Sequence, residues 1–390
     1  MRRRPCVQHL VNIGSSEQAQ DTLAERAQAV REGRAEPMKL DKEVMDAMFG
    51  TKVTFLQTVV RYLKEAIADA DEARIIDALH ELESEVTDID NANDLDHKTV
   101  DGLEPVLKLL SQPHPSADVR TAALWVVGTI VQSNPTAQEH MIAETDNGID
   151  VMQLLLEPLR EASAAQMAGA DAKLLSKALY ALGSLLRGAP RPQAVFVAAN
   201  GPQDLMAFIA AVADWAAQAD DVESEPSPPQ DHQAAAVGEE EDAAARAWLP
   251  VKRKAVALVG DLAMEHKNAD SQGGEGVAAV RQIHAAFSAL APQSAAASVL
   301  RMLGSSDREL EEKTLAALLA LLKGPGTAGS AAQILVGPAA AAKLDGTRNR
   351  AQRHLAAPDA DGESWEEVVL LAEQVIGILH NATAQARASA

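Results

Sequence analysis

The sequence has little of three things that many folds and binding sites require. It contains one cysteine, Cys6, so an internal disulfide and a cysteine-based zinc site are both excluded. Aromatic residues make up only 3% of the 390 residues, whereas β-sandwiches are richer in aromatic and β-branched residues. No stretch reaches the roughly 18 consecutive apolar residues that a membrane-spanning helix needs. These absences favour an all-helical chain without a membrane span.

Positive charge is also scarce. The chain has 35 lysines and arginines against 56 aspartates and glutamates, a net charge of −21 with a pI of about 4.9. A field of that sign repels phosphate backbones and anionic lipids, so neither nucleic acid nor a membrane is expected as a partner. Hydrophobic residues nevertheless make up 47% of the chain, which excludes disorder of the chain as a whole.

Motifs that carry catalysis or bind cofactors are missing from the sequence. No glycine-rich phosphate loop, dinucleotide fingerprint or nucleophile elbow is present, and the ten histidines include no pair at i, i+4. The acidic stretch "DIDNANDLD" (88–96) does not fit a calcium-binding EF-hand loop, since counting from Asp88 puts Ala92 and Asn93 at positions 5 and 6. We therefore predict no catalytic residue, cofactor or metal, and expect these residues to end one helix and cap the next.

Repetition is the strongest positive signal. Three apolar segments align without gaps, "AALWVVG" (122–128), "KALYALG" (177–183) and "KAVALVG" (254–260), and "KTLAALL" (313–319) fits more loosely. Each is apolar almost all round, which indicates a buried helix. The segments start 55, 77 and 59 residues apart, more than the roughly 40–47 residues of armadillo-like repeats, and the excess consists of inserts.

The inserts and turns complete the predicted organisation. The insert at about 216–247 is acidic and contains prolines, a composition typical of disorder. An Asn-Gly turn signal stands before a shorter amphipathic helix at 147 and again at 200. We predict an all-α, armadillo-like, right-handed α-solenoid of about four repeats with an N-terminal helical cap. The expected boundaries are a flexible segment 1–37, a cap 38–98, repeats 99–384 and a flexible C-terminus 385–390.

Superposing the repeats places lysines in one column. Lys177, Lys254 and Lys313 each stand at the start of a buried helix, where a cation opposes the helix dipole. Equivalent positions of a solenoid form a ladder along one face, so these cations could line a groove; solvated lysines and core aromatics are the alternative interpretation. The same superposition pairs Trp125 with Tyr180 and Gln132 with Arg187.

Residues 81–141 resemble the opening of a known family. The ordered blocks "DIDNANDL", "GLEPVLKLL" and "VQSNPTAQE" are similar to those of the armadillo-type nucleotide exchange factors of the 70-kDa heat-shock chaperones, the Fes/HspBP/Sil family. The resemblance covers roughly residues 40–320, with the inserts unmatched. The chain departs from the family at Ser133, where asparagine is common, in its long acidic insert, and in its first forty residues, which lack a clear match to the usual first helix.

The resemblance implies a non-catalytic co-chaperone, and a monomer is expected. Family members hold a lobe of the chaperone's nucleotide-binding domain with the concave face of the solenoid and speed ADP release. For Asn134-Pro135, the alternative interpretation is that the two residues only end one helix and have no role in binding. Matching positions and the internal ladder together predict a partner-binding surface of Arg120, Trp125, Gln132, Asn134, Gln138, Lys177, Tyr180, Arg187, Lys254 and Lys313.

Two questions stay open at the level of the sequence. A passive armadillo-like adaptor that holds a peptide or protein in its groove, with no effect on nucleotide, is the alternative function. The chain has no secretory apolar region and no KDEL-like ending, which favours the cytoplasm over an organelle or the lumen of the endoplasmic reticulum.

Overall fold

The structure is a computed structural model that describes residues 55–389, with gaps at 98, 112–115, 144–147, 223–233, 265–277, 279–280, 284, 288–294, 324–336 and 357–364. The chain divides into two compact units, residues 1–58 and 59–390. Only residues 55–58 of the first unit are described, and they form the start of a helix. Cys6, the expected flexible segment 1–37 and the beginning of the predicted cap therefore lie outside the described residues.

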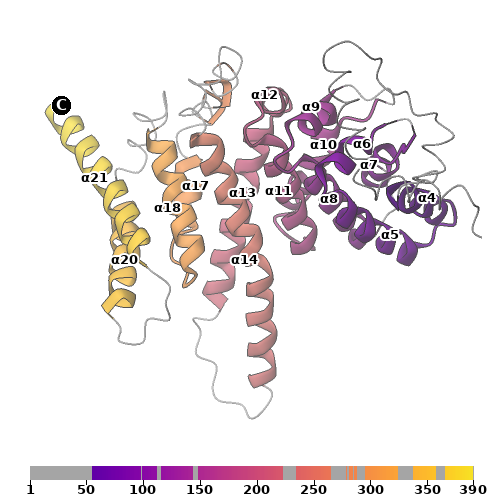
Figure 1. The fold of residues 1–390 in the computed structure, drawn as a ribbon. Helices are drawn as coiled ribbons and strands as arrows, with labels where there is room; N and C mark the ends of the chain where they lie inside the picture. Colours follow the sequence, from indigo (N-terminus) through magenta and orange to yellow (C-terminus); the bar gives the residue numbers. More distant parts are fainter. Residues whose placement is uncertain are drawn as a thin grey trace, which may run out of the picture. The chain divides into compact units, whose positions relative to one another are not determined.

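Every regular element in the described ranges is a helix (Figure 1), which confirms the all-α prediction. The helices are α4 (Phe55–Ala68), α5 (Glu72–Glu85), α6 (Ile89–Asp94), α7 (Leu103–Ser111), α8 (Ala117–Val131), α9 (Pro135–Ile142), α10 (Val151–Ala164), α11 (Ala172–Leu186), α12 (Pro190–Ala198), α13 (Gly201–Val222), α14 (Ala234–Met264), α17 (Ala295–Arg301), α18 (Arg308–Lys323), α20 (Pro338–Ala356) and α21 (Glu366–Ser389).

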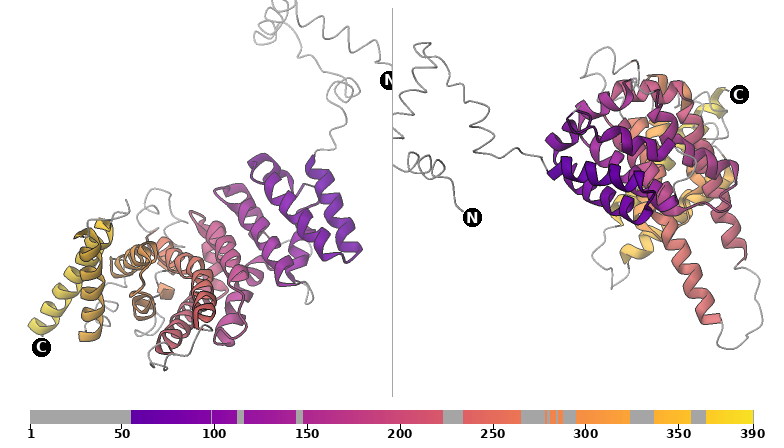
Figure 2. Two further views of the ribbon diagram at one scale, coloured as in Figure 1. Left: turned by 90° about the horizontal axis from the view of Figure 1, so that it is seen from below. Right: turned by 90° about the vertical axis from the view of Figure 1, so that its right-hand side faces the viewer.

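The helices of unit 59–390 pack in two layers that follow the chain order. In one layer α5, α8, α11, α14, α18 and α21 each pack against the next, and in the other α7, α10, α13 and α17 do the same. Figure 2 shows these successive helices from two further directions, and the short helices α9 and α12 pack against each other beside the layers. Stacking in which each element contacts mainly its neighbours in sequence is the defining property of an α-solenoid.

The predicted buried helices occupy the first layer. Residues 122–128 lie in α8, 177–183 in α11, 254–260 in α14 and 313–319 in α18. Each of these helices has a neighbour on both sides within its layer, which explains why apolar residues surround almost the whole helix axis. The layer also includes α5 from the predicted cap, so the cap continues the same stacking.

The acidic stretch at 88–96 forms a short helix of its own. Asp88 is the N-cap of α6, and its carboxylate accepts hydrogen bonds from the backbone N–H groups of Asp90 at 2.8 Å and Asn91 at 3.4 Å. The capping role predicted for this stretch is therefore confirmed. The predicted Asn-Gly turn at 200 is also present, since Asn200 has a φ of +61° directly before α13.

Helix occupies more of the acidic insert than its composition predicted. The backbone is helical up to Val222 in α13 and again from Ala234 in α14, within the stretch 216–247 whose composition is typical of disorder. The physical reason is the alanine-rich run "AAAVGEEEDAAARA" at the start of α14, because alanine and glutamate are strong helix formers. Residues 223–233 lie outside the described residues.

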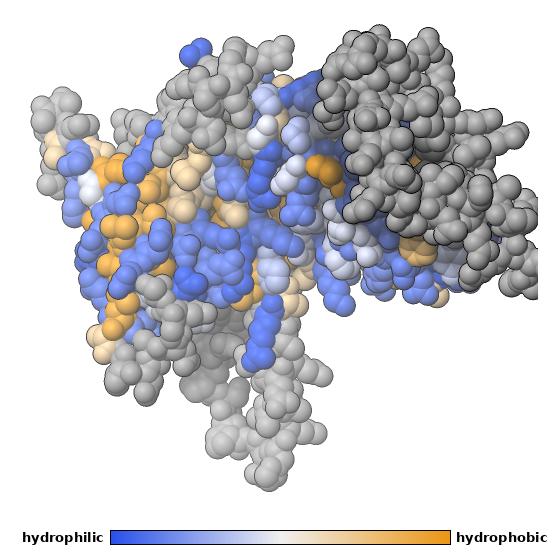
Figure 3. Space-filling model, in the orientation of Figure 1, coloured by the Kyte–Doolittle hydropathy of each residue, from blue (hydrophilic) through white to orange (hydrophobic). Residues whose placement is uncertain are grey.

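Apolar surface is visible at the C-terminal end of the layers. Figure 3 shows it over α20 and α21, where Leu355 and Leu370 are exposed. Among the described helices, none is by itself long and apolar enough to cross a membrane, and one bent pair, Pro190–Ala198 with Gly201–Trp215, meets the length and composition criteria together.

Candidate partner-binding surface

Four predicted residues from three successive helices of the first layer lie together. Trp125 comes from α8, Lys177 and Tyr180 from α11, and Lys254 from α14. All four side chains are partly exposed. Much of the rest of these helices is apolar and buried, and the four residues bring aromatic and cationic side chains to the surface.

Lys177 is at the centre of the cluster. Its ammonium nitrogen lies 3.4 Å from the centroid of the Trp125 ring and 5.8 Å from that of Tyr180. The Lys254 nitrogen lies 5.7 Å from the same Tyr180 centroid. A cation over an aromatic face is attracted by the negative potential of the ring, so the two rings stabilise both ammonium groups. Two lysines and two aromatic residues of the predicted surface thus lie in contact.

Polar contacts hold the aromatic residues in place. The Tyr180 hydroxyl donates a 2.9 Å hydrogen bond to Oε1 of Gln132, another predicted member, and lies 3.3 Å from the Thr129 hydroxyl. Thr129 in turn donates to Glu83 of α5 at 2.9 Å. The surface thus has a hydrogen-bonded chain running from α5 through α8 to α11.

Residues of α5 complete this surface, and the sequence analysis did not include them. His80 lies edge-on to Trp125, with ring centroids 5.8 Å apart, and Glu83 accepts the bond from Thr129. The repeat alignment began after residue 100, so α5 was never superposed on the other buried helices. The sequence gives no distinct signal for them, since His80 and Glu83 are two of many polar residues on the exposed side of α5.

The two lysines are electrostatically unusual. Burial, together with the neighbouring charge of Lys254, lowers the pKa of Lys177 to about 8, an effect that Glu83 partly opposes. Burial also lowers the pKa of Lys254. Lys254 donates hydrogen bonds to the backbone oxygen of Ser176 at 3.1 Å and to the Ser176 hydroxyl at 2.8 Å. Both cations are thus partly desolvated, and the charge of Lys254 acts on Lys177.

Arg187 lies at the C-terminus of α11, where its Nε donates a 2.6 Å hydrogen bond to Oδ2 of Asp261 on α14. Both side chains are about half exposed, at 51% and 42%. An exposed ion pair of this kind contributes little to stability, on the order of 0–1 kcal/mol, and can exchange its partner. Arg187 therefore remains part of the candidate surface.

Asn134 and Gln138 are interior residues, contrary to their predicted place on the surface. They are only 2% and 3% exposed. Asn134 caps α9 through the N–H of Ala137 and donates a 3.0 Å bond to Asn93. Gln138 donates to the backbone oxygens of Ser184 at 2.8 Å and Arg187 at 3.1 Å. Their side-chain amides hydrogen-bond backbone groups that are left unpaired at helix ends. The two residues therefore support the surface from inside and do not line it.

Arg120 and Lys313 make their contacts away from the cluster. Arg120 forms ion pairs with Glu157 at 3.8 Å and Glu161 at 3.5 Å, both on α10 of the other layer. Lys313 pairs with Glu309 of its own helix at 3.3 Å. The ladder of three lysines predicted from the repeats is thus a pair, Lys177 and Lys254, with Lys313 separately engaged.

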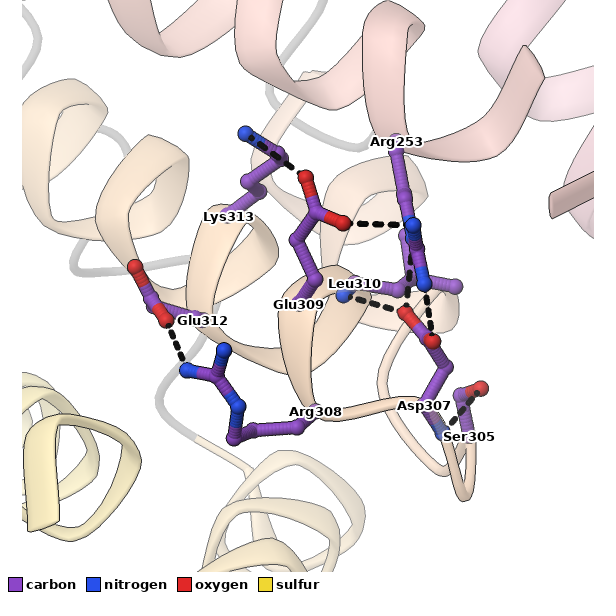
Figure 4. A network of polar contacts seen from close by, with 8 residues as sticks. All are labelled: Arg253, Ser305, Asp307, Arg308, Glu309, Leu310, Glu312 and Lys313. Carbon is purple, nitrogen blue, oxygen red and sulfur yellow. Dashed lines mark hydrogen bonds and ion pairs between the residues drawn. The ribbon is translucent and has the colours of Figure 1, made fainter. Parts of the chain in front are cut away.

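The surroundings of Lys313 form a second charged network (Figure 4). Arg253 of α14 donates to both carboxylate oxygens of Asp307 and forms an ion pair with Glu309 at 2.5 Å. Burial would raise the pKa of Asp307, but the bonds from Arg253 and from the Leu310 N–H outweigh burial and lower it. This network ties the start of α18 to α14, and its charges are already matched.

No group of three or more histidine, cysteine, aspartate or glutamate side chains in the described ranges is placed to hold a metal ion. The arrangement of the cluster suits recognition: aromatic faces, a cation pair and hydrogen-bonding groups are held on packed helices.

Comparisons with known proteins identify the relatives of this chain. Residues 7–95 match the family model described as "Nucleotide exchange factor Fes1". The match includes most of the first forty residues, for which the sequence analysis expected no clear counterpart. The chain is 33% identical over 124 residues to the "Hsp70 nucleotide exchange factor FES1" of Yarrowia lipolytica, a stretch that covers 32% of this chain and 39% of the relative. It is 27% identical over 153 residues to the Neurospora crassa protein "fes-1", covering 39% and 56%.

A solved structure supports the fold. The chain resembles the crystal structure of an engineered protein with a TM-score of 0.51 at 16% identity, over 84% of this chain and all of the engineered one. That likeness concerns the armadillo-like helical fold alone. In sequence, the matched stretches span 39% and 56% of the two relatives named above, less than two thirds of either. The resemblance read from the sequence is confirmed for these stretches, which are similar to the Fes1 family of Hsp70 nucleotide exchange factors.

Proposed function

We propose that the chain is a nucleotide exchange factor for a 70-kDa heat-shock chaperone, acting without catalysis of its own. The observation that carries the proposal is the match of residues 7–95 to the Fes1 family, together with relatives whose names all state that activity. The partner is the nucleotide-binding domain of the chaperone, and the effect is faster release of ADP.

The proposed contact surface is the cluster on α5, α8, α11 and α14. It combines aromatic faces, which supply large contact areas and are enriched where proteins bind one another, with cations that fix orientation. Of its helices, α8, α11 and α14 are packed on both sides and α5 is packed against α8, so the surface is rigid before the partner arrives and little ordering entropy is lost on binding. The residues assigned to it are His80, Glu83, Trp125, Gln132, Lys177, Tyr180, Arg187 and Lys254.

Exchange activity places a thermodynamic condition on this surface. A partner chaperone alternates between closed and open states of its nucleotide cleft, and a ligand that binds both equally well shifts neither. The surface must therefore fit the open state better. A tenfold preference corresponds to about 1.4 kcal/mol, which a few contacts of the cluster can supply.

Release of fluorescently labelled ADP from the chaperone tests the proposal. The chain should accelerate release when unlabelled nucleotide is added in excess. The variant Lys254→Glu should reduce this acceleration, because it reverses a charge within the cluster. Lys313→Glu is the matched control: it occupies the equivalent repeat position, but its ion pair is with Glu309 of its own helix, so release should remain close to that of the wild type.

The outcome also distinguishes the alternative function. Stable binding to a protein partner with no change in nucleotide release would contradict exchange activity and support a passive adaptor. We further propose a cytoplasmic location for the chain, on the sequence grounds given above; imaging of a tagged full-length chain tests it, and lumenal staining would contradict it.

A further inference from the structure

The Lys177 ammonium group has hydrogen-bonding capacity that the chain itself does not use. A lysine ammonium carries three N–H donors and no acceptor. Among the described residues, Lys177 contacts the Trp125 and Tyr180 rings and makes no hydrogen bond or ion pair. A partly buried cation in this state has lost part of its hydration without a full replacement.

Lys254 adds a second donor beside the first. Two of its three N–H groups are directed to the backbone oxygen and the hydroxyl of Ser176. The third is unassigned in the described part of the chain. Both ammonium groups face the same Tyr180 ring, at 5.8 Å and 5.7 Å from its centroid, and Lys254 is close enough to disfavour the charged form of Lys177. Two like charges that share one aromatic ring and influence each other are a favourable place for an anion.

The charged and titratable groups around the pair compensate this positive charge only in part. From α5, Glu83 is close enough to favour the charged form of Lys177, but its Oε1 accepts the hydrogen bond of Thr129. His80, also on α5, packs against the Trp125 ring of α8. On α14, Asp261 is held by Arg187. The nearby carboxylates are thus committed elsewhere.

We propose that Lys177 and Lys254 jointly bind one carboxylate of an acidic side chain on the partner protein, with the Trp125 and Tyr180 rings packed against its methylene groups. The proposal rests on the proposed function only in taking the chaperone as that partner. A carboxylate fits because its two oxygens can accept from both ammonium groups at once, and because aromatic faces accept an aliphatic stem.

Binding of a carboxylate has a consequence that can be measured on the wild-type protein. An anion beside Lys177 favours its charged form, so binding draws in a proton wherever the free lysine is partly neutral. With a pKa of about 8 in the free chain, roughly half a proton should be taken up per complex at pH 8 and almost none at pH 6.5. Affinity should accordingly weaken as the pH rises above 8.

Isothermal titration of the full chain with the chaperone tests the proposal. Each proton taken up by the complex is released by the buffer. Titrations at pH 8 in two buffers should therefore differ in apparent binding enthalpy by about half the difference between the ionisation enthalpies of the buffers. Lys177→Met and Lys254→Met should each weaken binding roughly tenfold. Lys173→Met is the control, because Lys173 is exposed in the first turn of the same helix, and its affinity should remain within twofold of the wild type.

The results separate this inference from the proposed function. If the chain accelerates ADP release but Lys177→Met and Lys254→Met bind as tightly as the wild type, the carboxylate site is overturned and the exchange activity stands. Identical heats in both buffers at pH 8 would also overturn it, independently of any variant. If proton uptake and the loss in both variants are found without accelerated ADP release, the site stands and exchange activity falls.

Discussion

Gly128 of α8 and Tyr180 of α11 lie so close that a side chain at residue 128 would occupy the space of the tyrosine ring. A Cβ built on Gly128 would lie 2.4 Å from both Cδ1 and Cε1 of Tyr180, and 3.2 Å from the Cα of Ala181. Real Cβ atoms do not approach other atoms to 2.4 Å. The absent side chain therefore lets Tyr180 reach Gln132 and lie beneath the two lysines.

Replacing Gly128 by alanine should destabilise the protein and disturb the candidate surface. Alanine in a helix interior is favoured over glycine by about 0.5–1 kcal/mol, but displacing a ring that is held by Gln132 and by its neighbours costs about 1–3 kcal/mol. We expect a lower free energy of unfolding in urea and weaker binding of the partner. Retention of wild-type stability and binding would show that the Tyr180 ring moves freely.

Gly183 offers a matched control for Gly128. It is the equivalent residue of the next repeat, and a Cβ there would meet only the end of the Arg187 guanidinium at 3.4 Å, an ordinary contact. Gly183→Ala should therefore stabilise the protein by up to about 1 kcal/mol through helix propensity. The two substitutions are identical in chemistry and in repeat position, so opposite signs would isolate the tertiary contact as the cause.

Ser133→Asn should stabilise the protein. Ser133 follows α8 with a φ of +53°, in the left-handed region. Asparagine tolerates that region better than serine because its short side chain bonds to the local backbone. We expect a gain of a few tenths to about 1 kcal/mol in the free energy of unfolding, measured by urea titration. This is also the position where the family commonly has asparagine, and a loss of stability would mean that another constraint acts on Ser133.

Gln138→Ala and Gln132→Ala should separate structural support from surface contact. Gln138 is buried and bonds two backbone oxygens at the end of α11, so its removal leaves acceptors unsatisfied and should cost about 1–3 kcal/mol of stability. Gln132 is exposed and its loss should be nearly neutral for folding. Binding assays under conditions where both variants are folded should show the larger effect for Gln132→Ala. The reverse order would assign the surface to Gln138.

Lys177→Met should alter the pH dependence of stability. The pKa of Lys177 is about 8 in the folded chain, below its ordinary value of 10.5. Between these values the unfolded chain binds more protons than the folded one, so wild-type stability gains with rising pH. Below pH 8 the lysine is charged in both states and carries its full desolvation cost.

Methionine has no such proton, so the difference in free energy of unfolding, wild type minus variant, should increase between pH 7 and pH 10. The increase should be about 1 kcal/mol after allowance for the partial exposure of the side chain. Urea titrations of both proteins at pH 7, 8.5 and 10 measure it. A difference that stays constant across this range would mean that the pKa of Lys177 is the same in both states.

The helical spacing of the apolar residues and the internal repeats were sufficient to predict the fold. The segments at 122–128, 177–183, 254–260 and 313–319 lie in buried helices of one layer, because a helix that is apolar all round can only be stable with neighbours on several sides. The acidic insert is helical on either side of 223–233, because the neighbouring alanines have a high helix propensity.

The motifs shared with the family could be identified in the sequence, but the hydrogen bond between them could not be predicted from it. Asn134, in the block "VQSNPTAQE", donates a hydrogen bond to Asn93 in "DIDNANDL", 41 residues earlier. Both motifs thus serve one partly buried contact, whereas the sequence pattern predicts Asn134 on the surface. No local pattern distinguishes a buried amide with partners from an exposed one, because its partners come from distant residues.

The sequence by itself determined the helices, their order and the equivalence of their positions. Gly128 and Gly183 are equivalent by that measure, and so are Lys254 and Lys313. The tertiary structure decided that Gly128 meets a tyrosine ring while Gly183 meets a flexible arginine, and that Lys254 joins Lys177 while Lys313 pairs with Glu309. A repeat fixes where a residue stands on its helix, whereas its contacts depend on side chains of the adjacent repeat, and in this chain those differ from one repeat to the next.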